Sequence, residues 1–152
     1  MLAPHQKEII EALKSESTWR LVFLSIITLG IYTAFYIKRQ SRALNEYLTT
    51  PGHRIKEGFI QFILVIAFVS AAIDVVDLIY GEDDPTVAAF SAGGDMLFGL
   101  SVIFWAFMMC TRLNYLLGAA KRTPLWSSKL WAFLFGALYI NYKVNTLWKR
   151  DV

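Results

Sequence analysis

Two aspartates inside an apolar stretch are the residues whose chemical type and spacing best suit a functional site. Asp74 and Asp77 follow Ser70 after four and seven residues, so the three side chains lie on one face of a helix. A carboxylate inside a bilayer costs roughly 3 kcal/mol to insert and needs a partner or water, so these residues form our candidate intramembrane polar site. Three interpretations stay open: hydrogen bonding to Ser70 or to a hydroxyl of the facing helix, proton or cation handling, and recognition of a basic group.

Other residue types that perform catalysis or bind metals are sparse. Cys110 is the only cysteine and lies in an apolar stretch, so no intrachain disulfide and no thiolate metal cage is expected. His5 and His53 lie far apart in the sequence, and no motif of a zinc protease, dithiol site, nucleophile elbow or phosphate-binding loop occurs. We therefore expect a non-enzymatic protein without catalytic residues, metal or cofactor.

The composition is typical of a membrane protein. Hydrophobic residues make up 56% of the 152 residues and charged residues only 18%, which is too apolar for a soluble domain. The basic residues flank apolar stretches instead of forming a stripe on a polar domain, so membrane lipids are expected partners and nucleic acid is not. No small-residue cleavage site follows the first apolar run, so we expect no removable signal peptide.

The chain divides into two regions. Residues 1–18 are expected to form an amphipathic helix on the membrane surface, because Ile9, Ile10 and Leu13 recur at helical spacing. Residues 19–152 are expected to form the membrane domain. About 20 residues are needed to cross a hydrocarbon core of about 30 Å, so the two central apolar segments are long enough, the first is marginal and the fourth is short. These segments are 21–37, 59–80, 96–117 and 130–142.

The charge distribution orients a central transmembrane helical hairpin. No Lys, Arg or His occurs between Glu57 and Thr111, whereas the predicted loop 81–95 is acidic. Because basic residues favour the cytoplasmic side, we expect this loop outside and both termini in the cytoplasm. The predicted fold class is an all-α membrane protein in which the hairpin is flanked by two further apolar helices and the N-terminal amphipathic helix.

The two outer apolar segments either cross the membrane or re-enter it. If both cross, nine basic residues lie inside and six outside, whereas all fifteen lie inside if neither crosses. Re-entrant backbone is tolerated where protein covers its polar groups, and the hairpin could provide that cover. We favour re-entry, and four full crossings through a tilted or thinned bilayer are the alternative.

Small residues and basic residues complete the set of candidate sites. Small residues at helical spacing let membrane helices approach closely, and those expected to do so are Gly30, Ala34, Gly99, Ala106 and Gly136. A basic cytoplasmic rim either sets the topology or binds anionic head groups, at about 1 kcal/mol per residue. The rim comprises Lys38, Arg39, Arg42, Arg54, Lys56, Arg112, Lys121 and Arg122.

Three sequence patterns resemble a known family. They are the run from Ser25 to Tyr32, which reads SIITLGIY, the pair Leu44-Asn45, and the closing run from Gly136 to Asn145, which reads GALYINYKVN. They are similar to the uncharacterised bacterial membrane protein family catalogued as domain of unknown function forty-two thirty-four. The resemblance implies a small multi-helix protein, which we place in the bacterial inner membrane, and supplies no activity, cofactor or catalytic residue. A short internal echo, Leu44-Asn45 against Leu113-Asn114, fits either duplication or chance.

Three functions are compatible with the sequence. The leading hypothesis is an accessory subunit or membrane-organising element that acts through lipid and protein contacts, as a homo-oligomer or in a larger membrane complex. A small channel or transporter subunit that uses Asp74 and Asp77 is the second. The third is an immunity-type protein that neutralises a membrane-active toxin through acidic residues 82–84.

Overall fold

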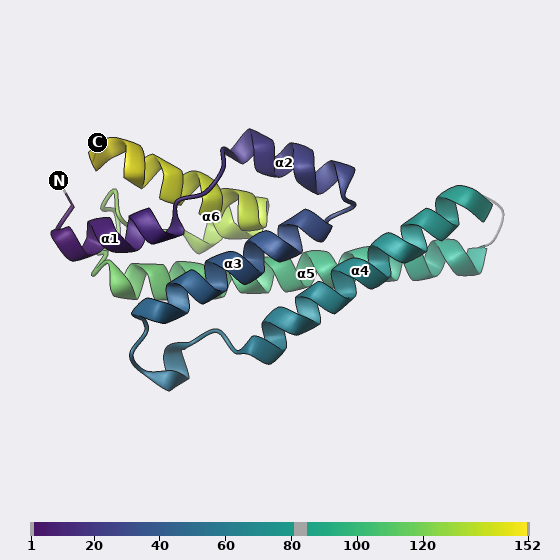
Figure 1. Cartoon of the computed structure of the whole chain (residues 1–152), viewed down its shortest axis with the longest axis horizontal. Coiled ribbons are helices and arrows are strands. Elements are labelled where there is room, and N and C mark those ends of the chain that lie inside the picture. Colours follow the sequence, from purple (N-terminus) through teal and green to yellow (C-terminus); the bar gives the residue numbers. More distant parts are fainter. Residues whose placement is uncertain (1, 81–84, 152) are drawn as a thin grey trace.

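The computed structural model describes residues 2–80 and 85–151, and within them every regular element is a helix. This confirms the predicted all-α class. Figure 1 shows a long hairpin with shorter helices packed along one half of it. The elements are α1 Pro4–Leu13, α2 Thr18–Ile27, α3 Ile31–Tyr47, the 3-10 turn η1 Pro51–His53, α4 Glu57–Tyr80, α5 Pro85–Leu116 and α6 Lys129–Asp151.

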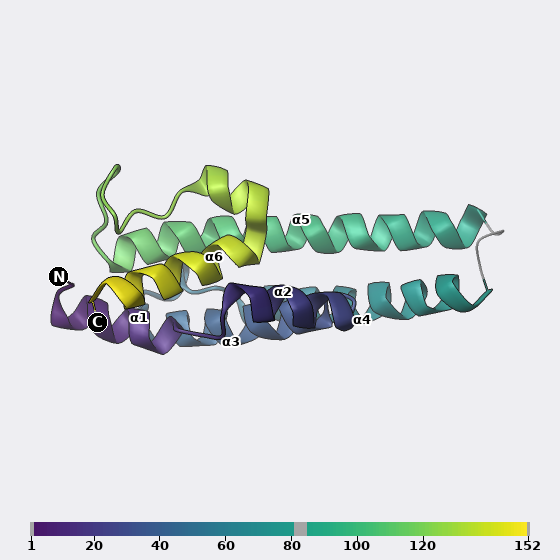
Figure 2. The same cartoon turned by 90° about the horizontal axis from the view of Figure 1, so that it is seen from above.

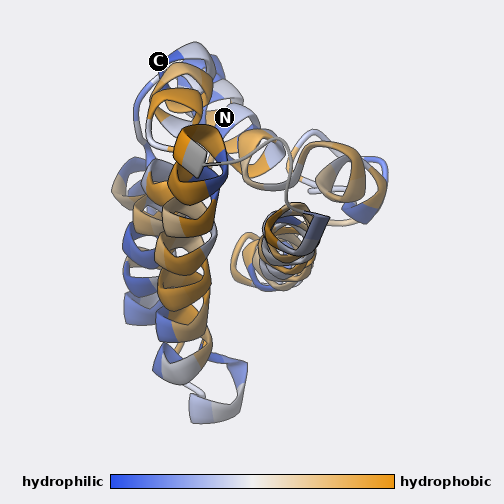
Figure 3. Cartoon of the chain, turned by 90° about the vertical axis from the view of Figure 1, so that its right-hand side faces the viewer, coloured by the Kyte–Doolittle hydropathy of each residue, from blue (hydrophilic) through white to orange (hydrophobic). Residues whose placement is uncertain are grey.

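Helices α4 and α5 form the central hairpin and extend beyond the other helices (Figures 1 and 2). Two stretches, Pro51–Ile79 and Pro85–Leu116, are long and apolar enough to cross a membrane, and only 33% of the apolar 18-residue window in each is buried inside the protein. Leu78 and Phe90 are among the exposed apolar side chains near the end of the hairpin. Hydrophobic residues also cover much of the ribbon seen from that end (Figure 3). This apolar outer surface favours a membrane protein.

Helix α5 begins earlier than the sequence predicts. Residues 85–95, which we expected in the outer loop, are helical, and the acidic residues 82–84 lie outside the described residues. The prediction failed because two glycines, Gly93 and Gly94, suggested a turn. Gly94 instead permits close packing, since a Cβ there would lie 2.7 Å from the Ser70 hydroxyl oxygen.

Both outer apolar segments reverse direction at a glycine. Between α2 and α3, Leu29 and Gly30 have φ angles of 48° and 85°. In α6, Gly136 has φ 51° and ψ −127°, a conformation that strongly favours glycine. The chain turns back at both points (Figures 1 and 2). Segments 21–37 and 130–142 are therefore each two helical pieces. With 10 residues, α2 reaches about 15 Å, half of a hydrocarbon core.

Helix α1 packs against the protein. Its apolar side chains Ile9, Ile10 and Leu13 are at most 1% exposed, because α3 and α6 cover them. The expected membrane-surface helix was inferred from these same residues. Amphipathic spacing marks an apolar face, and the tertiary structure provides a protein partner for it instead of lipid.

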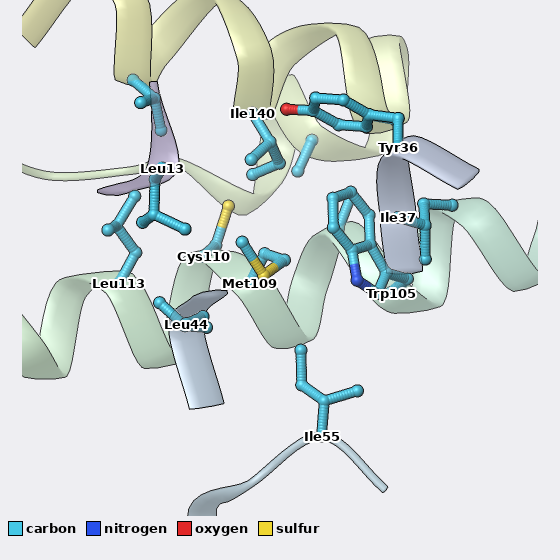
Figure 4. Packing of buried hydrophobic residues seen from close by; sticks show 14 of the residues in the cluster. Leu13, Tyr36, Ile37, Leu44, Ile55, Trp105, Met109, Cys110, Leu113 and Ile140 are labelled. Carbon is cyan, nitrogen blue, oxygen red and sulfur yellow. The ribbon is translucent and has the colours of Figure 1, made fainter. Parts of the chain in front are cut away.

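The buried core lies at the half of the hairpin that carries the shorter helices. In Figure 4, Tyr36 and Ile37 of α3 face Trp105 of α5, and Ile140 of α6 lies beside Tyr36. The Tyr36 and Trp105 rings meet edge to face with centroids 6.1 Å apart, and the Trp105 indole N–H donates to the Ser41 hydroxyl at 2.8 Å. The core therefore holds both outer segments against the C-terminal half of α5.

Candidate functional site

A polar cluster joins the α1–α2 linker and the first residue of α2 to α3 and α6, which lie far from them in the sequence. The shorter helices converge there on the shared core, so their polar groups need partners within the protein. We call this group the Glu16 cluster. Its members are Ser15, Glu16, Thr18, Tyr32, Arg39, Asn141 and Asn145.

Three side chains donate hydrogen bonds to the Glu16 carboxylate. The Tyr32 hydroxyl donates at 3.0 Å, Nη2 of Arg39 donates at 2.8 and 3.1 Å, and the Ser15 hydroxyl donates over a short distance. The Glu16 side chain is 11% exposed and that of Arg39 is 52% exposed. The carboxylate is thus largely covered, whereas its cationic partner stays at the surface.

The surroundings of Glu16 favour its ionised form. Burial raises the pKa of this carboxyl, but the hydrogen bonds from Ser15 and the Glu16 backbone, the charge of Arg39 and the Tyr32 hydroxyl together lower the pKa below 4.5. The carboxylate is therefore charged at neutral pH, and donors from the protein occupy its oxygens. This arrangement suits positioning of the three segments better than proton transfer.

Two asparagines of α6 bind the backbone of the same residue. The side-chain amides of Asn141 and Asn145 donate to the Glu16 carbonyl oxygen at 3.1 and 2.9 Å. The Thr18 hydroxyl donates to Oδ1 of Asn141 at 2.9 Å. Residues four apart share a helix face, so one face of α6 fixes the linker that leads into α2.

The run SIITLGIY builds the reversal between α2 and α3. The Thr28 hydroxyl donates to the Leu24 carbonyl at 2.8 Å and accepts from the Tyr32 backbone N–H at 2.9 Å, so it connects the end of α2 to the start of α3. A hydrogen bond of 2.7 Å joins the Ser25 and Thr33 hydroxyls across the turn. This turn starts α3 in the register that brings Tyr32 to Glu16.

Two further asparagines close the loops that lead into α4 and α6. Asn45 accepts from the Ile55 N–H at 2.8 Å and donates to the Ile55 carbonyl at 2.9 Å. Asn114 makes the same pair of bonds with Ser127, at 2.7 and 2.9 Å. Each contacted residue lies two positions before the next helix. The sequence echo Leu-Asn therefore corresponds to a shared loop-closing contact.

The predicted intramembrane polar site connects the two helices of the hairpin. The Ser91 hydroxyl of α5 donates to Oδ1 of Asp74 at 2.7 Å, so Asp74 bonds a hydroxyl of the facing helix. Ser70 does not provide this bond, because its buried hydroxyl oxygen has no hydrogen-bond partner. Asp77 is half-buried. The described residues contain no group of three His, Cys, Asp or Glu side chains placed to hold a metal ion.

The small residues differ in what they contact. Ala34 and Ala106 are fully buried in the core. A Cβ on Gly30 would lie 2.8 Å from the Phe98 ring and one on Gly136 would lie 3.2 Å from Val102, so both reversals pack closely on α5. Gly99 differs from them, because a Cβ there would meet nothing within 4 Å in this chain, so its role in helix packing stays a prediction.

The basic rim contains arginines that contact other parts of the protein and residues whose side chains are largely exposed. Arg39 joins the Glu16 cluster, and Nη2 of Arg42 lies 2.7 Å from Oε1 of Glu57. Arg54 donates to the Leu48 carbonyl and Arg112 to the carbonyls of His53 and Met108. Four rim arginines therefore have contacts inside the protein. The exposed rim residues without a side-chain bond described above are Lys56, Lys121 and Arg122, and Lys38 is half-buried.

The Glu16 cluster was not predicted from the sequence. Its signals were present, since Asn141 and Asn145 are spaced four apart and Glu16 lies five residues before the first apolar segment, 21–37. Sequence spacing alone gave no reason to bring α6 to the α1–α2 linker, more than 120 residues away. The missing information was therefore the long-range pairing.

Comparison with known proteins gives one match. A model of the family described as Domain of unknown function (DUF4234) matches residues 16–147. The matched range includes six of the seven members of the Glu16 cluster and both glycine reversals. No curated protein and no solved structure matches the chain.

Proposed function

We propose that this chain, which belongs to the family described as Domain of unknown function (DUF4234), is a non-enzymatic membrane protein that organises one leaflet of the bilayer. Its central hairpin would cross the membrane, and its two outer segments would enter the cytoplasmic leaflet and return. The observation that carries this proposal is the combination of short length and exposed apolar side chains on α2 and on the first part of α6.

The exposed apolar side chains support lipid contact by both outer segments. On α2, Trp19 is 83% exposed and Ile26 69% exposed, and on α6, Leu130 is 66% and Phe133 56% exposed. Neither piece is long enough to cross a hydrocarbon core of about 30 Å. Such segments fit one leaflet, where they displace lipid without contributing to the other leaflet.

The depth of the two reversals supports the same arrangement. Gly30 and Gly136 contact Phe98 and Val102, which lie one helical turn apart near the midpoint of α5. The two segments thus reach the same level along the hairpin. The Glu16 cluster ties their other ends together, so the segments form a rigid wedge.

The ends of the chain support a common orientation. Both termini lie at the end of the molecule where α5 ends, opposite the α4–α5 connection (Figure 1). All basic residues lie in the parts of the sequence before Glu57 and after Thr111, and none lies between these two residues. We place this end in the cytoplasm of a bacterial cell and the protein in the inner membrane as a multi-pass protein.

Depth measurements on reconstituted protein test the wedge. Single spin labels at positions 23 and 27 of α2, 134 of α6 and 76 of α4 would be compared by their accessibility to oxygen and to a water-soluble relaxing agent. We expect position 27 to lie deeper than 23, and vesicles containing the protein to become smaller as protein is added. A label at position 27 that is accessible from the outer aqueous phase would contradict the proposal, because α2 would then cross the membrane.

A variant separates the wedge from the hairpin. Replacing Phe23 and Ile26 with Ser removes apolar contact from α2, so the effect on vesicle size should decrease while the hairpin still inserts. The matched control replaces Val75 and Val76, which are exposed on α4, with Ala. Equal loss in both variants would show that the wedge is not responsible.

A further inference from the structure

An elongated crevice lies between the start of α2 and α6. It consists of two adjoining cavities of about 410 and 390 Å³, which share Thr18 and Tyr142 in their walls. One cavity is almost wholly apolar, and the other adds lysine and hydroxyl side chains to a lining that is still largely apolar. The crevice is thus amphipathic along its length.

The apolar cavity is built from one helix. Trp131, Phe135, Leu138 and Tyr139 of α6 line it, together with the shared residues. The Trp131 and Phe135 rings stack with centroids 5.9 Å apart. A flexible hydrocarbon chain suits such a wall, because aromatic faces offer apolar area without competing polar groups.

The second cavity carries positive charge and hydroxyl groups. Lys14 and Lys149 line it, and no Asp or Glu does among the described residues. Nζ of Lys14 lies 4.4 Å from the centroid of the Trp148 ring, which holds this ammonium group at the cavity. The first residues of α2 and the hydroxyls of Ser15, Ser17 and Thr146 complete the wall. An anion is the complementary occupant, and the positive end of the α2 dipole favours it further.

We propose that the crevice binds one anionic glycerophospholipid. The phosphate would lie between Lys14 and Lys149, and one acyl chain would lie along Trp131 and Phe135. The charge of the polar cavity and its continuity with an apolar one together select an amphiphile over a free phosphate. The inference rests on the proposed function only in that this end of the protein must lie at the membrane interface.

Lipid titration of the purified full chain tests the site. Delipidated protein in mild detergent would be titrated with phosphatidylglycerol and with phosphatidylcholine of the same acyl chains, and bound lipids would be counted by native mass spectrometry. We expect one lipid per chain with a clear preference for phosphatidylglycerol. Lys14→Gln combined with Lys149→Gln should reduce this preference by about 30-fold, since each lysine near a head group contributes about fivefold.

Matched variants keep the test specific. Lys7→Gln combined with Lys129→Gln changes the net charge equally at exposed positions outside both the crevice and the basic rim and should retain the preference. Phe135→Ala should weaken the binding of both lipids by a similar factor, because it reduces the apolar wall of the crevice without changing its charge. An unchanged circular dichroism spectrum and unfolding temperature without lipid would show that each variant is folded.

Four results would overturn the inference: equal affinity for the two lipids, unchanged preference in the variant at positions 14 and 149, equal loss of preference in the control at positions 7 and 129, or displacement of bound lipid by glycerol phosphate at similar concentration. The depth measurements on α2 are independent of lipid selectivity. A chain that forms the wedge but binds both lipids equally would therefore refute the lipid site alone.

Discussion

Two tyrosines on one face of α3 have different surroundings. Tyr32 donates to the Glu16 carboxylate at 3.0 Å, whereas the Tyr36 hydroxyl, one turn further on, is buried and makes no well-formed hydrogen bond, although the Asn141 side chain lies close enough to interact with it. The Tyr36 ring nevertheless packs against Trp105. Identical residues therefore contribute to stability in different ways, one through its hydroxyl and the other through its ring.

Substituting each tyrosine with Phe separates these contributions. Tyr32→Phe removes a hydrogen bond to a charged group and should cost about 1 to 2 kcal/mol of unfolding free energy. Tyr36→Phe removes a buried hydroxyl that makes no well-formed hydrogen bond, so it should change the unfolding free energy by less than about 1 kcal/mol in either direction. Denaturant or thermal unfolding in detergent measures both. A larger loss in Tyr36→Phe than in Tyr32→Phe would show that the two roles are reversed.

The Glu16 carboxyl group makes the stability of the protein depend on pH. The folded state lowers the pKa of this carboxyl below 4.5, so its stabilisation is complete above that value and declines as the pH falls through the lower folded pKa. Glu16→Gln should cost about 1 to 2 kcal/mol at pH 7, where the half-exposed Arg39 is screened by solvent, and should flatten the pH dependence below pH 5. Unfolding temperatures between pH 3 and 7 measure this. Glu11→Gln at an exposed position is the control, and parallel curves for wild type and Glu16→Gln would contradict the expectation.

The elements are organised by two glycine reversals. Gly30 and Gly136 adopt positive φ angles and bring the backbone close to α5. These two properties are separate requirements, since the first concerns backbone conformation and the second concerns space. Gly99 in the interior of α5 meets neither requirement. The three glycines thus provide a comparison within one protein.

Alanine substitutions test the reversals. Gly30→Ala should destabilise the protein by about 1 to 3 kcal/mol, because a left-handed Ala is strained and its Cβ would contact the Phe98 ring. Gly136→Ala should lower the free energy of unfolding by a similar amount. Gly99→Ala should be neutral or stabilise by up to about 1 kcal/mol, since Ala favours helix over Gly. Thermal unfolding compares the three variants, and a loss in Gly99→Ala as large as that in Gly30→Ala would refute the proposed role of the reversals.

The whole molecule is asymmetric along the hairpin. One half carries α1, α2, α3 and α6 around the shared core, and the other half consists of α4 and α5 alone (Figure 1). In a bilayer this shape gives the two leaflets different amounts of protein. The orientation of the molecule therefore decides which leaflet would be affected.

Labelling of single cysteines with a membrane-impermeant reagent tests the orientation. After Cys110→Ala, cysteines would be placed at the exposed positions Ala3, Thr50, Thr123 and Ala88. We expect only position 88 to be labelled in intact cells, and the other three only after permeabilisation. Labelling of position 3 from outside would instead indicate that α2 and the chain that follows it cross the membrane.

Oligomeric state is the remaining property at this scale. Side chains such as Leu78 and Phe90 leave apolar surface on the hairpin, which lipid or a second copy could cover. The sequence predicts a homo-oligomer or a larger membrane complex, and this stays a prediction. Light scattering of the protein in mild detergent would measure the mass of the particle.

The sequence by itself determined the helical class, the two helices able to cross a membrane and the family. These properties depend on composition and on periodicity over a few turns, which are local. It also singled out Gly30 and Gly136 as small residues that allow close helix contact, whereas the chain reversals at these glycines were not predicted. The start of α5 was missed, since Gly93 and Gly94 look the same in a turn and in a close helix contact.

Only the tertiary structure decided what each face contacts. Ile9, Ile10 and Leu13 form an apolar face that either lipid or protein could cover, and the fold covers it with α3 and α6. The Glu16 cluster likewise depends on Asn141 and Asn145, which reach the α1–α2 linker only because Gly136 turns α6 back. Spacing within one helix fixes which side chains share a face. The partner of that face is set by packing between distant segments, and this is why the cluster and the crevice beside it became visible only in the folded chain.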